Sequence, residues 1–205
     1  MADELLRQAF KRLNRVMLFN WRLGLGPFLS FAPQIVGRYM VITHIGRKSG
    51  LQRRTPLNFA PIGDKVYCVA GFGHIADWYK NIMVNPEVEV WLPSGRWQAL
   101  AEDVTDGEDS LPIVREVLIN SGFAAVFAGI NPHTVDDETL KEQTQEYRLV
   151  RLTLLKPIEG EGGPGDLAWV WLIVGAVGVM IGILRLLKAL ARVSPAQKTP
   201  RSRGR

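Results

Sequence analysis

Short hydrophobic runs, divided by turn-forming residues, predict strands along the middle of the chain. Six segments are rich in β-branched or aromatic residues, and the last of them also alternates between two faces. They are residues 39–44, 55–60, 65–71, 88–92, 96–104 and 147–155. Helical patterns at 77–84 and 108–130 interrupt them without a regular strand–helix–strand rhythm. We therefore expect an α+β domain over residues 28–157, a small six-stranded antiparallel barrel with surrounding helices.

Residues 1–27 carry the pattern of an amphipathic helix. Apolar side chains recur at spacings of three and four from Leu6 to Trp21, and Arg7, Lys11 and Arg15 follow another face. The segment lacks the apolar region and cleavage site of a secretory signal. Two placements fit the pattern equally: on an anionic membrane surface, or packed across the domain.

The end of the chain changes character. Residues 158–166 include four glycines and predict a linker, and residues 167–184 contain no charged side chain. This stretch is just long enough to cross a bilayer, so we predict a transmembrane helix at 167–190, followed by a basic tail at 191–205. A buried terminal helix is the alternative.

The membrane topology stays open at this point. The positive-inside rule would put the basic tail in the cytoplasm and the domain outside, whereas a domain without an N-terminal signal favours the cytoplasm. A shallow, non-spanning C-terminal anchor would satisfy both. We expect a membrane localisation with a cytoplasmic domain.

Charge is concentrated at that same end. The 205-residue chain has a net charge of +5, but residues 185–205 carry seven cations and no acid, leaving −2 for the remainder. The high isoelectric point therefore belongs to the tail, and the domain is not expected to bind nucleic acid. The single cysteine, Cys68, excludes an internal disulfide and fits a reducing compartment.

A basic loop at residues 46–54 offers the clearest candidate chemistry. Within it, eight consecutive positions hold Arg47, Lys48, Arg53 and Arg54, and Gly46 and Gly50 flank the first pair. Glycines allow positive φ and a close backbone approach to a ligand, while arginine forks and a lysine point charge suit phosphate or carboxylate. The pattern indicates a site for a small polyanion. A solvated basic hairpin accounts for the spacing equally well.

Several other chemistries are excluded. His44, His74 and His133 have no partner at metal-ligand spacing, so no metal site is predicted, and neither a nucleophile elbow nor a phosphate-binding P-loop occurs. No intrinsic redox group is present, so redox chemistry would need a bound cofactor. No catalytic residue stands out; Tyr79 and His74 are the candidates for a proton donor.

The order of these motifs resembles the deazaflavin-dependent nitroreductase family. The resemblance covers about residues 38–157 and rests on five segments, Gly46-Arg47-Lys48-Ser49-Gly50, Arg53-x-x-Pro56-Leu57, Ala70-Gly71-Phe72-Gly73, Asp77-Trp78-Tyr79-x-Asn81 and Asn85-Pro86-x-Val88. It implies a six-stranded split β-barrel, membrane association or a homodimer, and coenzyme F420 as cofactor, with FMN less favoured. By position, the implied cofactor-binding residues are Arg47, Lys48, Ser49, Arg53, Ala70, Gly71, Asp77 and Trp78.

The function implied is a membrane-associated oxidoreductase. It would transfer a hydride from the reduced deazaflavin to an electron-poor apolar acceptor: a membrane quinone, an activated alkene or a nitro compound. The alternative is a non-catalytic membrane protein that binds a flavin, deazaflavin, haem or lipid. Turnover with an added acceptor discriminates the two, because a carrier binds the reduced coenzyme without oxidising it.

Overall fold

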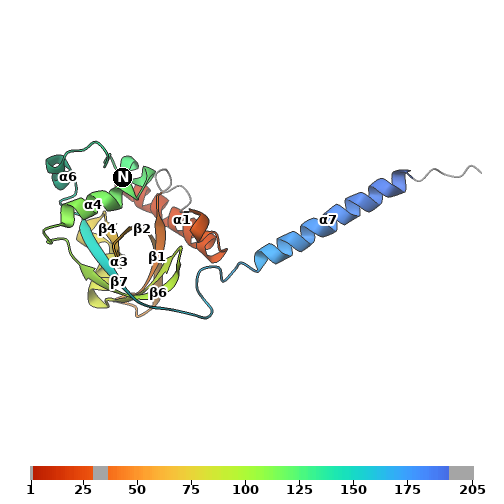
Figure 1. The fold of residues 1–205 in the computed structure, drawn as a ribbon, viewed down its shortest axis with the longest axis horizontal. Coiled ribbons are helices and arrows are strands. Elements are labelled where there is room, and N and C mark those ends of the chain that lie inside the picture. Colours follow the sequence, from red (N-terminus) through yellow and green to blue (C-terminus); the bar gives the residue numbers. More distant parts are fainter. Residues whose placement is uncertain (1, 30–36, 194–205) are drawn as a thin grey trace, which may run out of the picture. The chain divides into compact units, whose positions relative to one another are not determined.

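The computed structural model describes residues 2–29 and 37–193 (Figure 1). Its contacts divide the chain into two units, Met1–Leu167 and Ala168–Arg205. The predicted basic tail falls mostly on residues 194–205, outside the described residues.

The first unit contains both helices and strands. Its helices are α1 (Ala2–Arg22), α2 (Gly26–Leu29), the short 3₁₀ helix η1 (Gly73–Ile75), α3 (Asp77–Val84), α4 (Ser110–Ile119), α5 (Phe123–Phe127) and α6 (Asp137–Gln143). Its strands are β1 (Tyr39–Ile45), β2 (Gln52–Asn58), β3 (Ala60–Ile62), β4 (Lys65–Ala70), β5 (Glu87–Leu92), β6 (Gly95–Asp103) and β7 (Arg148–Pro157).

All strands belong to one antiparallel sheet of order β2-β1-β5-β6-β7-β4-β3. β2 and β3 are its two edges, yet only Phe59 separates them in the chain. A flat sheet of this order would hold those edges far apart, so the sheet must curl until they almost meet. The α+β class and the curled antiparallel sheet are therefore as predicted.

The prediction of six strands is wrong by one. The segment expected as a single strand at 55–60 begins earlier, at Gln52, and ends at Asn58; beyond Phe59 the chain changes pairing partner and forms β3 against β4. Phe59 and Ala60 are both buried, so the hydrophobic pattern continues across this break. The pattern therefore does not show where β2 ends and β3 begins. The pattern also did not predict the short helices α2, η1 and α6.

The core has three parts. Inward-facing residues of the sheet, such as Met40, Ile42 and Val90, pack with Ile82 of α3 inside the curl. A second cluster lies between the β4–β7 side and α4 and α6, around Leu140 and Leu149. The third packs Trp21 of α1 against the outer face of β1 and β5. Figure 1 shows α4 and α6 on one side of the sheet and α1 beside β1.

Helix α1 is packed along one face and exposed along another. Trp21 is fully buried, and its ring lies 6.5 Å from that of Trp91. Leu13, Val16 and Phe19 are about half exposed. The helix thus packs across the domain through its C-terminal half and still presents an apolar stripe; side chains before Arg12 lie outside the described ones.

The segment predicted as a glycine-rich linker is hydrogen-bonded to the first unit; residues 158–167 are called the strap below. The Ile158 amide donates to the Arg96 carbonyl at 2.8 Å, and the Gly165 and Leu167 amides donate to the Trp21 and Arg22 carbonyls at 2.9 and 2.8 Å. The Arg22 guanidinium pairs with Asp166 at 2.9 Å. The bonds of Gly165, Asp166 and Leu167 join the end of α1 to a segment more than 140 residues later.

The second unit contains helix α7 (Val170–Val193). Its segment Val170–Leu190 is long and apolar enough to cross a membrane, and none of it is buried. At about 1.5 Å per residue, these 21 residues are about 32 Å long, close to the thickness of a bilayer's hydrocarbon core.

Candidate functional site

The basic loop is a tight turn between β1 and β2. The Gly46 amide donates to the Leu51 carbonyl at 2.9 Å, and the Gly50 amide donates back to Gly46 at 2.8 Å. Gly50 has φ +65°, which glycine adopts without strain. Gly46 matters for a different reason: a Cβ there would lie 2.7 Å from Ser49 Oγ and 2.8 Å from Arg53 Nε, so these two side chains of the hollow would have to shift. Of the two glycines expected to take positive φ, only Gly50 does.

The loop and the start of α3 enclose a hollow of about 230 Å³. Its lining includes three cations and one carboxylate, so its charge suits a small polyanion. The lining residues are Gly46, Arg47, Lys48, Ser49, Arg53, Asp77 and Asn81.

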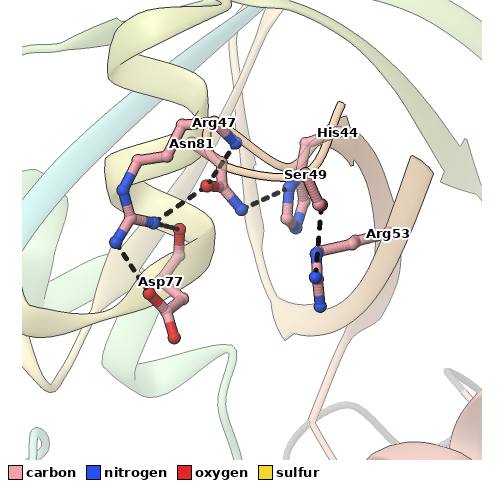
Figure 2. Close-up of polar contacts among 6 residues, drawn as sticks. All are labelled: His44, Arg47, Ser49, Arg53, Asp77 and Asn81. Carbon is pink, nitrogen blue, oxygen red and sulfur yellow. Dashed lines mark hydrogen bonds and ion pairs between the residues drawn. The ribbon is translucent and has the colours of Figure 1, made fainter. Parts of the chain in front are cut away.

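Arg47 is fastened to α3 at several points (Figure 2). Its guanidinium donates to Asp77 Oδ1 at 3.0 Å, to the Asp77 carbonyl at 3.3 Å and to Asn81 Oδ1 at 2.9 Å. Its backbone amide also donates to Asn81 Oδ1, at 3.1 Å. The hydrogen bond from Arg47 lowers the pKa of Asp77, although the Asp77 side chain is 85% exposed.

The other two cations make few contacts within the protein. Arg53 donates to Ser49 Oγ at 3.4 Å, the outer limit of a hydrogen bond. Within the described part of the chain, Lys48 makes no hydrogen bond and no ion pair. Both can therefore meet an incoming anion without first breaking a strong internal contact.

A buried polar row lies beneath the loop. Asn81 Nδ2 lies 3.2 Å from His44 Nδ1, and His44 Nε2 lies 3.1 Å from Thr55 Oγ1. Asn81 and His44 are 3% and 2% exposed. Burial, reinforced by the positive charge of Arg53, lowers the pKa of His44 to about 4, so the imidazole is neutral at neutral pH.

The predicted cofactor-binding residues divide into two groups. Arg47, Lys48, Ser49, Arg53 and Asp77 line the hollow together. Ala70, Gly71 and Trp78 do not line it. Ala70 is buried at the end of β4, Gly71 follows it and is exposed, and Trp78 packs against the core inside the sheet. Their roles toward the cofactor stay predictions.

The two candidate proton donors also lie apart from the hollow. The Tyr79 hydroxyl donates to Asp103 of β6, and its pKa is raised to about 12 by burial and by that carboxylate. His74 is exposed, with Nδ1 4.0 Å from a Glu146 carboxylate oxygen. In the described part of the chain, no three His, Cys, Asp or Glu side chains gather as a metal site would require.

Asn81 and His44 are the residues that sequence reasoning did not assign. A signal for Asn81 was available, because it follows Asp77 by four residues and so shares its face of α3. No comparable signal marked His44. Its polar side chain is buried on β1, a strand that is buried almost throughout. Only its contact with Asn81 of α3 accounts for a polar residue at that position.

Comparison with known families gives one match. Residues 30–124 match the model of the F420H(2)-dependent quinone reductase family. The matched segment includes the basic loop and α3, and with them every residue that lines the hollow.

Solved structures similar to the chain include three of related size. The heme storage protein HutZ from Vibrio cholerae is 16% identical, with a TM-score of 0.44 over 68% of this chain and 94% of that one. A conserved hypothetical protein from Mycobacterium tuberculosis is 14% identical, with a TM-score of 0.46 over 68% and 90%. An F420-H2 dependent reductase is 19% identical, with a TM-score of 0.40 over 56% and 92%.

The chain is thus similar, over the segment that builds the hollow, to an oxidoreductase family that uses reduced F420. This confirms the resemblance stated from the sequence, and with it the class of enzyme and the cofactor. The protein is a deazaflavin-dependent reductase, and its cofactor is coenzyme F420.

Proposed function

We propose that this reductase transfers a hydride from reduced F420 to a quinone at a membrane surface, with the hollow at the basic loop holding the cofactor's acidic tail. The observation that carries the proposal is the grouping of Arg47, Lys48 and Arg53 around one hollow whose lining includes a single carboxylate, Asp77. A phosphate or carboxylate there meets two cations with few internal contacts. The residues present therefore fit an anionic cofactor tail.

The residues have separate tasks in this proposal. Lys48 and Arg53 bind the anionic tail directly, and Ser49 keeps Arg53 near it through the 3.4 Å contact. Arg47 is held by α3 and can exchange the exposed Asp77 carboxylate for an incoming anion. Bound reduced F420 supplies the hydride, and the domain's task is to orient the ring and exclude water.

The reduced quinone also needs a proton, and the surroundings of Tyr79 and His74 decide which of the two we propose as its donor. Tyr79 donates its hydroxyl hydrogen to Asp103, and its raised pKa makes it a weak acid at neutral pH. His74 is accessible to solvent and beside Glu146. Of the two candidates, we propose His74 as the more accessible donor. Replacing it with alanine should lower turnover more than Tyr79→Phe does.

The test of the function is turnover in detergent solution. The full chain is mixed with reduced F420 and a soluble quinone, and the return of the oxidised coenzyme's absorbance is followed. We expect the coenzyme to be oxidised faster with the quinone than with a nitroimidazole or an activated alkene at equal concentration. A preference for either of the other acceptors would reject the quinone assignment. Coenzyme binding without oxidation by any acceptor would reject the reductase reaction itself.

We further propose that α7 anchors the protein and leaves the domain in the cytoplasm. Its apolar side chains are exposed along its length, and burying ten of them in lipid would contribute on the order of 15 kcal/mol. Leu13, Val16 and Phe19 of α1 add an exposed apolar stripe, and Arg12 and Arg15 beside it would favour anionic lipid. An apolar quinone dissolved in the same membrane would then lie close to the enzyme.

Membrane fractionation tests the anchor. The full chain should stay with membranes through a high-salt wash and leave them with detergent. A chain ending at Leu167 keeps the strap and its bonds to α1, so it should fold and still bind F420. It should also be released by salt, because only α1 would hold it. Release of the full chain by salt alone would reject the anchor.

A further inference from the structure

The contacts of Asn81 determine how its amide is oriented. Its Oδ1 accepts two hydrogen bonds from Arg47, one from the backbone amide and one from the guanidinium. The NH₂ group must therefore face His44, where Nδ1 lies 3.2 Å away. Since the amide donates, His44 Nδ1 must be an acceptor. The imidazole is then neutral, and its Nε2–H donates to Thr55 Oγ1 at 3.1 Å.

The charged groups around His44 favour the same neutral form. Arg53 stands opposite His44 in the β1–β2 pairing, and Arg47 lies on the other side of Asn81. The carboxylate that lines the hollow, Asp77 of α3, is already paired with Arg47. A proton on the imidazole would therefore meet two cations and an amide NH₂ group.

Arg47 has two partners of different kinds on α3. The Asp77 carboxylate is 85% exposed, and an anion entering the hollow competes with it for the guanidinium. Asn81 is 3% exposed and neutral, so an anion does not displace it, and it also holds the Arg47 backbone. Exchange at Asp77 can then proceed while Asn81 keeps the loop in place.

We propose that Asn81, backed by His44 and Thr55, is the positioning residue that holds Arg47 ready for the cofactor's anionic tail. The inference rests on the proposed role of the hollow in binding F420. It assigns His44 a function as a fixed hydrogen-bond acceptor and not as an acid or base. It predicts that the affinity for F420 depends on the protonation of His44 once the amide donor is removed.

The decisive variant is Asn81→Asp. Aspartate can still accept from Arg47, but it has no donor for His44 Nδ1. The new carboxylate also places a negative charge beside His44, which favours the protonated imidazole, so the pKa of His44 should rise. F420 binding by this variant should be strongest at low pH and fall at least threefold as the pH rises from 5.5 to 8. The wild type should show no such fall, because its imidazole stays neutral throughout.

Two readouts separate positioning from general damage. Fluorescence titration with F420 gives the affinity at each pH, and imidazole NMR signals follow the three histidines. The His44 signal should not titrate between pH 5.5 and 8 in the wild type and should titrate there in Asn81→Asp. Adding His44→Gln to that variant supplies an amide donor and should abolish the pH dependence. The matched control is Asp77→Asn on the same helix face: it removes the carboxylate that competes for Arg47, so it should strengthen F420 binding by the same factor at every pH and introduce no pH dependence.

Asn81→Leu removes acceptor and donor together. It should weaken F420 binding about tenfold and raise the KM for reduced F420 while kcat at saturation stays within about twofold. If this variant does not fold, Asn81→Asp and its pH profile decide. A wild-type pH profile in Asn81→Asp together with a His44 that does not titrate would overturn the inference. F420 binding is measured without turnover, so the role of Asn81 can be tested even if the quinone reaction fails. A wild type that does not bind F420 would reject both the role of Asn81 and the proposed function.

Discussion

Arg53 and Arg54 are neighbours in β2 and occupy opposite faces of the sheet. Arg53 pairs across from His44 and lines the hollow with one long contact to Ser49. Arg54 pairs across from Thr43, on the outer face, where its guanidinium lies 5.0 Å from the Trp91 ring centre and donates to the Gly162 carbonyl of the strap at 3.4 Å.

The difference shows that identical side chains acquire different functions from strand alternation alone. Successive side chains of a strand point to opposite faces, so a pair of adjacent arginines cannot serve one small site together. The inner arginine is available to a ligand, and the outer one stabilises the contact between sheet and strap. The four cations of the basic loop are therefore three binding candidates and one structural residue.

The largest expected effect is a loss of folding stability at low pH, caused by His44 beneath the basic loop. The pKa of His44 is lowered to about 4 in the folded protein from an ordinary 6.5, so the unfolded chain binds the proton more readily. Its contribution to stability is complete above pH 6.5 and is lost as pH falls toward 4, an expected decrease of about 3 kcal/mol. Urea unfolding across this range measures the slope.

The matched variant for that experiment is His44→Gln, which keeps an acceptor for Asn81 and does not titrate. Its stability should depend less on pH between 6.5 and 4 than that of the wild type. Equal slopes for the two proteins would show that another group causes the loss.

Removing Arg53 should affect binding and leave folding almost unchanged. Arg53→Ala loses a charge-assisted contact with the cofactor and should weaken F420 binding by about 1.5–3 kcal/mol, about one to two decades in Kd. Lys48→Ala should behave similarly. Arg54→Ala is the control and should leave Kd within about threefold. Equal losses in Arg53→Ala and Arg54→Ala would remove the distinction between the two faces.

Removing Arg54 should have the opposite effect: it should lower folding stability and leave F420 binding almost unchanged. Arg54→Ala loses the cation–π contact with Trp91 and the bond to Gly162, which should lower the free energy of unfolding by about 1–2 kcal/mol. Chemical denaturation measures the change, and Arg53→Ala should stay within about 0.5 kcal/mol of the wild type. A larger loss in the Arg53 variant would mean that its side chain is structural as well.

The smallest effect is expected at the strap. Asp166→Asn weakens the pair with Arg22, whose side chain is 38% exposed, so the expected loss is about 0.5 kcal/mol and should disappear at high salt. Hydrogen exchange of the Gly165 and Leu167 amides should accelerate, because these amides donate to α1 beside that pair. F420 binding should be unchanged. A weaker Kd in this variant would connect the strap to the hollow.

Much of the fold could be predicted because its signals are local. Strand β1, the β5–β6 turn and helix α3 each combine an apolar run or a periodic pattern with turn or stop residues within a few positions. The cations and glycines of the basic loop likewise indicate an anion site by their spacing alone, and five of the eight predicted cofactor-binding residues line one hollow.

What the sequence by itself determined, then, is the α+β class, the candidate anion-binding loop and the apolar C-terminal helix, because each follows from neighbouring residues. Tertiary structure decided the rest: the break at Phe59 that makes β3, the strap's bonds to α1, and the row from Arg47 through Asn81 to His44. The strap's bonds to α1 and the bonds of the row join residues 34 to 145 positions apart. No periodicity within a segment specifies such a pair; only the curl of the sheet and the docking of helices bring its members within hydrogen-bond distance.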